Sequence, residues 1–102
     1  MEIYYSFNGG CLDLSLVGEL DEFCAERAKQ QLDKIITENK PNSIVYDMSR
    51  LAFMDSTGIG VLIGRYKLAK SMGCTCAVKN VSRVVDKIFV MSGLYQIMPK
   101  IS

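Results

Sequence analysis

The sequence predicts a single α/β domain with a mostly parallel sheet, an antiparallel N-terminal edge hairpin and helices packed on the sheet. Three observations predict this class. The chain has 102 residues, enough for one hydrophobic core and too few for two. Patterns typical of strands and helices follow one another in the order strand, strand, helix, strand, helix, strand, helix, strand. Asn-Gly-Gly at residues 8–10 is a strong hairpin signal between the first two strands. We therefore expect residues 1–102 to form one domain.

The N-terminal half is predicted to contain the hairpin and the first helix. Residues 2–7 are rich in strand-forming side chains, and apolar and polar residues alternate within 11–20. Asp21 is a candidate N-cap for a helix over 22–40, which Pro41 ends. This helix carries one apolar stripe for the sheet, formed by Ala25, Ala28, Leu32, Ile35 and Ile36.

The C-terminal half is predicted to alternate strands and helices. A buried strand covers 43–48 and a loop covers 51–55. A second helix runs from about residue 56 to 72, a core strand covers 74–80, a third helix ends at Gly93, and 95–102 is a last short strand. The second helix has a core stripe and a further apolar stripe, which indicates a second packing partner, either the third helix or another protein. The two stripes are Ile59, Leu62, Ile63, Tyr66 and Ala69, and Val61, Leu68 and Met72.

Composition excludes several classes of function. Twelve Lys and Arg against eleven Asp and Glu leave a net charge of +1, so we expect no nucleic-acid or anionic-lipid binding. No apolar run approaches the ~20 residues of a membrane-spanning helix, and the N-terminus lacks the pattern of a signal peptide. We therefore expect a cytoplasmic protein. The chain has no histidine, which removes Ser–His and Cys–His hydrolysis and the usual metal triads. We expect no catalysis, cofactor or metal.

The four cysteines, at positions 11, 24, 74 and 76, give a weaker signal. In a reducing compartment disulfides are not expected. Cys74 and Cys76 are two apart in a predicted strand, so they face the same side and do not form a C-x-x-C pair. A zinc site made of all four sulfurs is the alternative to small apolar core filling.

The stretch MDSTGIG, residues 54–60, is the most distinctive in the chain. It lacks the G-x-S-x-G of a hydrolase elbow, the Lys-Ser/Thr of a P-loop, and the third small residue of a dinucleotide fingerprint, where Ile63 stands instead. Ser56 lies at or beside a helix N-cap. The loops 18–21 and 54–57 both leave carboxyl ends of strands, so we expect them to be neighbours. Gly60 and Gly64 share a face of the helix, which indicates close approach of something to its backbone.

The segments FMDSTGIGVLIGRYK (53–67), GELD (18–21) and FVMSGL (89–94) together resemble the anti-sigma factor antagonists of the STAS-domain family, and the sporulation branch most of all. The resemblance runs from residue 17 to about residue 98. Relatives in that branch usually continue into a further helix, whereas this sequence stops at Ser102.

The resemblance implies a switch. The serine that follows the aspartate, here Ser56, is expected to be phosphorylated by an anti-sigma factor that is itself a serine kinase, and dephosphorylated by a serine phosphatase. The unmodified protein is expected to bind the anti-sigma factor and so free the sigma factor, and phosphate is expected to abolish productive binding. The residues expected to contact the partner are Asp21, Met54, Asp55, Thr57, Gly58, Ile59 and Val61.

Two alternatives stay open at this point. One is a STAS regulator of another pathway, such as general stress. The other is a receiver-type domain phosphorylated on aspartate, with Asp47, Glu19, Asp21 and Lys79 around a bound Mg²⁺. Direct nucleotide binding is also left open, although no motif supports it.

Overall fold

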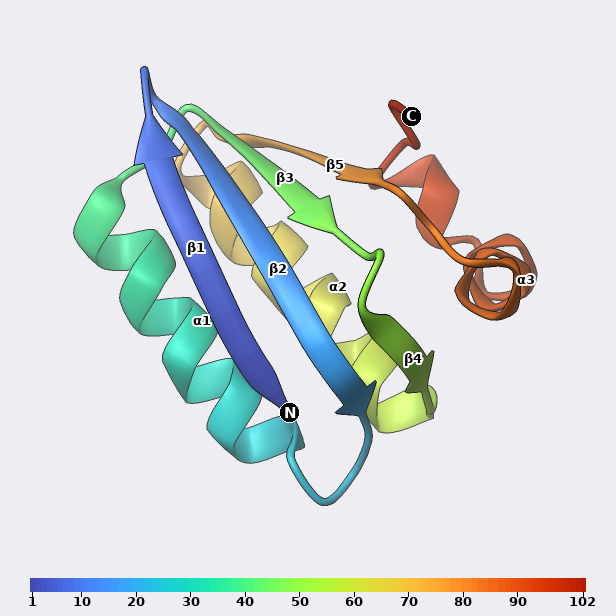
Figure 1. Cartoon of the computed structure of the whole chain (residues 1–102). Coiled ribbons are helices and arrows are strands. Elements are labelled where there is room, and N and C mark those ends of the chain that lie inside the picture. Colours follow the sequence, from blue (N-terminus) through green and yellow to red (C-terminus); the bar gives the residue numbers. More distant parts are fainter.

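The computed structural model describes residues 1–102 and shows a five-stranded sheet with helices α1 and α2 against one of its faces (Figure 1). The central order is β1-β2-β3-β5, and β4 pairs with the last residues of β2, beyond the part that pairs with β3. The β1–β2 pair is antiparallel and all other pairs are parallel. The predicted fold class is confirmed. The elements are β1 (Glu2–Asn8), β2 (Cys11–Leu20), α1 (Ala25–Asn39), β3 (Ser43–Asp47), β4 (Leu51–Met54), α2 (Ser56–Ser71), β5 (Thr75–Lys79) and α3 (Arg83–Ser92), followed by the short 3₁₀ helix η1 (Leu94–Gln96).

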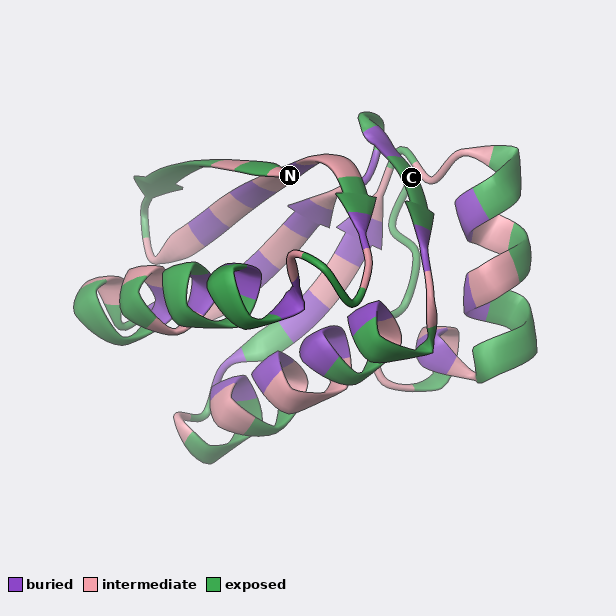
Figure 2. Ribbon diagram, turned by 90° about the horizontal axis from the view of Figure 1, so that it is seen from below, coloured by how far each residue is buried: buried purple, intermediate pink, exposed green.

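The hairpin forms where Asn-Gly-Gly predicts it. Gly9 and Gly10 both have positive φ, 57° and 81°, a region that glycine enters without a steric penalty. Along β2, alternate side chains point to the helices, and Leu12, Leu14 and Leu16 are fully buried. This alternation sets the register of the sheet (Figure 2), because a slip of one residue would turn the leucines to solvent.

One element of the sheet differs from the prediction. Residues 51–55 were expected to be a loop, but Leu51–Met54 is strand β4. The reason is the length of β2: its first half pairs with β3, and its last residues, from Gly18 on, remain free to pair with the segment that follows β3. The Gly18 amide donates to the Arg50 carbonyl over 3.0 Å, and the register shifts between Gly18 and Glu19. A four-residue strand is too short to be recognised by alternation.

The predicted core stripe of α2 is confirmed in part, because Leu62 and Ala69 are buried and the other three members pack against the core half-buried. The buried residues of α2 are Gly58, Val61, Leu62, Arg65 and Ala69, whereas Ile59, Ile63 and Tyr66 are half-buried. The helix lies in the angle between the sheet and α1, so two of its faces are covered. The second apolar stripe therefore packs internally, and α1 rather than α3 covers Val61.

The C-terminal segment also differs from the prediction. Instead of a strand over 95–102, the chain makes η1 after Gly93, whose φ of 78° ends α3. Only the last residues follow β5: the Val78 amide donates to Pro99 O, and the Ile101 amide donates to Val78 O, each over 2.9 Å. Helix α3 packs against β4 at that side of the sheet.

Cys74 and Cys76 are buried in the core, as core filling requires. None of the helices has both the length and the apolar character that a membrane span requires.

Candidate functional site

The loops 18–21 and 54–57, which the sequence predicts to be neighbours, do meet. Because β2 and β4 run parallel and pair at Leu20 and Met54, both strands end at the same point of the sheet. The Asp55 amide donates to the Leu20 carbonyl over 3.3 Å. The residues after β2 and the N-terminus of α2 thus form one continuous surface at the lower edge of the molecule in Figure 1.

Asp55 holds this junction together. Its Oδ1 accepts from the Gly58 amide over 2.9 Å, which makes Asp55 the N-cap of α2. Its Oδ2 accepts from the Glu22 amide over 3.0 Å, across 33 residues of sequence. The Gly58 amide bond, followed by the one from Glu22, holds the pKa of the Asp55 carboxyl below its ordinary value. Asp55 is therefore a carboxylate that ties the β2–α1 loop to α2.

Ser56 is the first residue of α2, directly beside the cap. It is exposed, and its hydroxyl makes no hydrogen bond within the chain. Asp55 does the capping, so the structure requires nothing of the Ser56 hydroxyl. Thr57, the next residue, is exposed as well. A second protein has free access to both hydroxyls.

The glycines of α2 are not equivalent. A Cβ on Gly58 would lie 2.0 Å from the Leu20 carbonyl oxygen, so only glycine allows α2 to begin this close to β2. At Gly60 and Gly64 an added Cβ would meet nothing within 4 Å. Each of these two costs the helix about 1 kcal/mol relative to alanine. Packing within the domain explains Gly58 and does not explain Gly60 or Gly64.

The apolar surface near Ser56 consists of other residues than those expected. Met54 is 1% exposed and Gly58 is buried against β2, so neither offers a free surface to a partner. Val61, 7% exposed, lies between α2 and α1 and not on the surface beside Ser56. Ile59 is half-buried and does reach the surface. Beside Ser56 it lines a shallow groove of about 380 Å³ between α2, β4 and α3. The other residues around this groove are Phe53, Met54, Asp55, Ile88, Met91 and Ser92.

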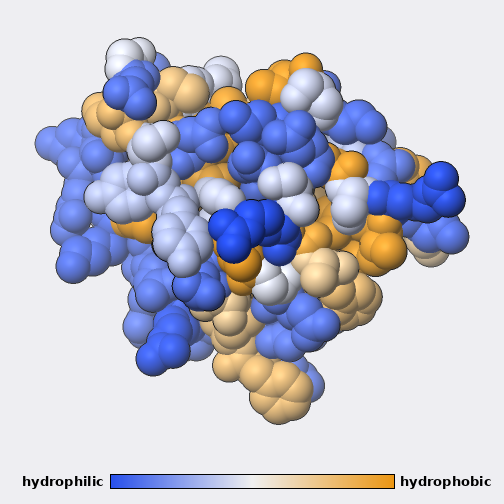
Figure 3. All heavy atoms as spheres, in the orientation of Figure 1, coloured by the Kyte–Doolittle hydropathy of each residue, from blue (hydrophilic) through white to orange (hydrophobic).

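Aromatic and methionine side chains project beside this groove. Phe53 is 44% exposed, Met91 is 81% exposed and Phe23, in the neighbouring loop, is 91% exposed. In Figure 3, apolar atoms gather at the lower part of the molecule, where Figure 1 places that loop and β4. Exposed apolar side chains grouped in this way are typical of a protein interaction site. We name Phe23, Phe53, Ile59, Ile88 and Met91 the docking patch. Met91 was not among the residues that the sequence singled out; the run of four apolar residues over 88–91 is the signal that could have found it.

Asp21 shapes the loop that carries Phe23. Its Oδ1 accepts from the amides of Phe23 and Cys24, over 3.1 and 3.3 Å. Helix α1 begins only at Ala25, and Cys24 stands at its N-cap position without a side-chain hydrogen bond. Asp21 was expected to cap a helix starting at residue 22, and instead it closes the turn before α1.

The acidic groups of the receiver-type alternative do not come together. Asp47 pairs with Ser15 in the sheet, and Asp21 lies six residues further along the chain from Ser15, a span of about 20 Å. Lys79 forms an ion pair with Asp13 over 2.8 Å. No three of the residues Asp, Glu and Cys are grouped as a metal site would require. The geometry gives this alternative no site.

These features define the class of the protein. Residues 3–102 match the STAS domain, and the chain belongs to the STAS domain family. Within that family it is 38% identical over 99 residues to the anti-sigma F factor antagonist of Paenibacillus polymyxa, covering 97% of this chain and 85% of the relative. It is 26% identical to the anti-sigma-B factor antagonist of Bacillus subtilis, covering 89% and 82%.

Solved structures agree with this assignment. The unphosphorylated form of the anti-sigma factor antagonist SpoIIAA superposes with a TM-score of 0.79 at 28% identity, covering 99% of this chain and 89% of that one. The phosphorylated form of the Bacillus cell fate determinant SpoIIAA superposes with a TM-score of 0.69, also at 28% identity, covering 99% and 92%. The chain is thus similar to a protein known in both a phosphorylated and an unphosphorylated form.

Proposed function

We propose that this protein is a cytoplasmic anti-sigma factor antagonist of the sporulation type, a binding module without catalysis of its own that is switched by phosphorylation of Ser56. In the unmodified state it binds an anti-sigma factor with serine kinase activity, which then releases its sigma factor. A serine phosphatase restores this state after phosphorylation. The observation that carries the proposal is an exposed, unengaged serine hydroxyl at the edge of an exposed apolar patch.

The helix terminus explains why the modified protein stays folded. Ser56 is at the first position of α2, where the positive end of the helix dipole favours an anionic group. No contact of the Ser56 side chain has to break for phosphate to be added. Modification therefore changes the surface and leaves the core intact.

The surroundings explain why phosphate opposes binding. Phosphate adds about −1.5 to −2 charges next to Phe53, Ile59 and Met91, which a partner would cover. The residues 18–24 and 53–59 contain four carboxylates and no Lys or Arg, so the loops offer no counter-ion. Covering an unpaired charge is unfavourable. A loss of about 3 to 4 kcal/mol weakens binding about 100- to 1000-fold.

The relatives favour the sporulation branch. Two of them, at 38% and 30% identity, are anti-sigma F factor antagonists, whereas the anti-sigma-B factor antagonists are 26% identical. We regard regulation of general stress as the second candidate on the same evidence. Capture of the native partner from cell extract, with identification of the sigma factor it releases, distinguishes the two pathways.

The experiment that tests the switch uses the anti-sigma factor kinase and ATP. We expect mass spectrometry to place phosphate on Ser56 and not on Thr57. Calorimetry should show that Ser56→Ala binds the kinase as the unmodified protein does and that Ser56→Asp binds at least tenfold more weakly. Ser71→Asp is the matched control, because it adds the same charge at the other end of α2, about 22 Å away. Phosphate on another residue, or equal affinities for Ser56→Asp and Ser71→Asp, would contradict the proposal.

A further inference from the structure

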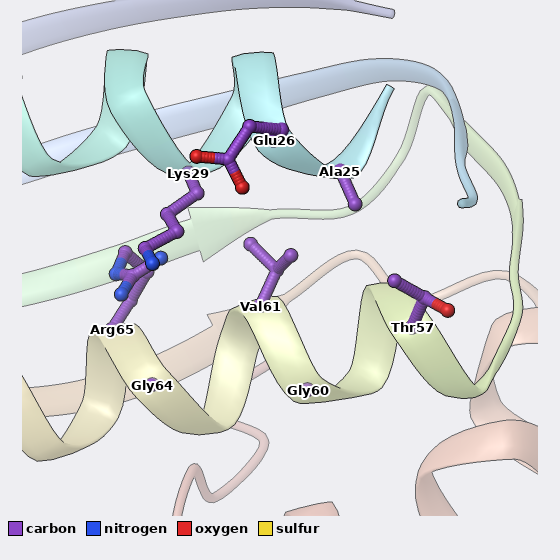
Figure 4. Close-up of a pocket in the computed structure, with 8 residues that line it drawn as sticks. All are labelled: Ala25, Glu26, Lys29, Thr57, Gly60, Val61, Gly64 and Arg65. Atoms are coloured by element: carbon purple, nitrogen blue, oxygen red, sulfur yellow. The ribbon is translucent and has the colours of Figure 1, made fainter. Parts of the chain in front are cut away.

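A groove of about 320 Å³ runs between α1 and α2 on the side of α2 away from the docking patch (Figure 4). Thr57 lies at one end of it and Arg65 at the other, two turns of helix or about 12 Å apart. The groove therefore begins at Thr57, one residue from Ser56. Its lining comes from both helices and consists of Ala25, Glu26, Lys29, Thr57, Gly60, Val61, Gly64 and Arg65.

The wall that α2 contributes is made of small residues that the fold does not require. Gly60 and Gly64 line the groove, and a Cβ at either position would meet open space. Alanine would strengthen the helix at both positions. Glycine instead leaves the backbone of α2 bare toward the groove. Such a surface suits another polypeptide backbone that approaches closely from outside.

The far end of the groove carries two positively charged side chains with unused hydrogen-bonding capacity. Arg65 is 7% exposed, its Nε lies 2.9 Å from Oδ1 of Asp33, and its buried Nη1 has no partner. Arg65 and Asp33 thus form an ion pair, in which Nε makes no hydrogen bond. Lys29 forms no ion pair. Figure 4 shows both side chains extending toward this end of the groove, and Glu26 is the one acidic residue in the lining.

A buried guanidinium with an unpaired N–H and a free lysine beside it attract an oxyanion, because each donor then gains a charge-assisted hydrogen bond. We propose that the α1–α2 groove receives a segment of the anti-sigma factor whose carboxylate pairs with Lys29 and Arg65. The segment's backbone passes over Gly60 and Gly64. This inference rests on the proposed function and extends its interface from Ser56 along α2. Continuity with the Ser56 site through Thr57, and a length of two helical turns, favour a protein segment over a free anion.

Calorimetry with the anti-sigma factor kinase tests this through two variants of the groove. Lys29→Gln removes one cation, and we expect about fivefold weaker binding, with a shallower dependence of affinity on salt. Gly64→Ala fills the groove, and we expect at least tenfold weaker binding together with a melting temperature raised by about 5 °C. A variant that binds worse while it is more stable separates a role in binding from a role in folding. Lys67→Gln, an exposed position on α2 outside the groove, is the control and should leave both quantities unchanged.

Three results would overturn the inference. If Lys29→Gln and Gly64→Ala bind like Lys67→Gln while Ser56→Asp binds weakly, the groove is no part of the interface and the proposed function still stands. If Ser56→Asp also binds normally, both proposals fail. If inorganic phosphate produces saturable NMR shifts at Gly60 and Gly64 that depend on Lys29, and affinity for the kinase is unaffected by either variant, the groove holds a free anion instead.

Discussion

Gly58 and Gly60 lie two residues apart in the same helix, and the structure predicts opposite effects when each is replaced by alanine. A Cβ at position 58 would sit 2.0 Å from the Leu20 carbonyl oxygen and 3.0 Å from two further atoms of Leu20. Ordinary contacts begin at about 3.4 Å, so α2 or the end of β2 has to move by about 1.4 Å. At position 60 the added Cβ meets nothing within 4 Å.

The magnitudes follow from two opposing effects. Overpacking against backbone lowers the free energy of unfolding by up to about 3 kcal/mol, and the higher helix propensity of alanine raises it by about 1 kcal/mol. We therefore expect Gly58→Ala to be less stable by about 2 kcal/mol. For Gly60→Ala only the higher helix propensity applies, so we expect the free energy of unfolding to rise by about 1 kcal/mol. The entropy of unfolding of a domain of this length is about 0.2 kcal/mol per degree, which converts these values to a fall of about 10 °C and a rise of about 5 °C in melting temperature.

Thermal unfolding followed by circular dichroism measures both variants, and urea titration at 25 °C checks that the same order holds away from the melting temperature. A stabilised Gly58→Ala would show that α2 does not lie against Leu20 as described. A destabilised Gly60→Ala would show that the face of α2 at the groove is covered within the domain, which would also remove the steric basis of the groove proposal.

Three further predictions follow from single contacts. Asp55→Asn keeps an acceptor for the Gly58 amide and loses the one for the Glu22 amide. Because the folded pKa of Asp55 is lowered, its stabilisation is present above the unfolded value near about 4 and is lost as the pH falls below that value through the folded pKa. The melting-temperature difference between the parent and Asp55→Asn should therefore be present at about pH 7 and vanish at acidic pH. Phe89→Ala removes a fully buried ring that packs on Tyr95 at 5.1 Å between ring centroids. Urea titration should show a free energy of unfolding lowered by about 3–5 kcal/mol. The control Val90→Ala, at the exposed neighbouring position, should lower it by less than about 0.5 kcal/mol. Phe23→Ala should leave the melting temperature within experimental error and weaken binding of the anti-sigma factor at least tenfold by calorimetry, and unchanged affinity would remove Phe23 from the docking patch.

Local chemistry was enough for much of the fold. The Asn-Gly-Gly turn, the leucine alternation of β2, the stripe of α1 and the glycine that ends α3 each act within a few residues, and each was placed correctly. Strand β4 was missed because its pairing depends on the unoccupied end of β2, which is more than thirty residues away in the chain. The prediction of a last strand over 95–102 was wrong because Gly93 leads into a 3₁₀ turn, so only the final residues reach β5.

The candidate site divides in the same way. The sequence by itself determined that a serine follows an aspartate at a helix start, that no histidine is present to activate it, and that three glycines interrupt the helix behind it. Tertiary structure alone decided which of these groups are free. Met54 is apolar and near Ser56 in sequence, yet it is buried in the core, whereas Phe23, Phe53 and Met91 reach the surface from the β2–α1 loop, from β4 and from α3. The physical reason is that exposure depends on what packs against a side chain, and for this surface the packing comes from segments far apart in the chain.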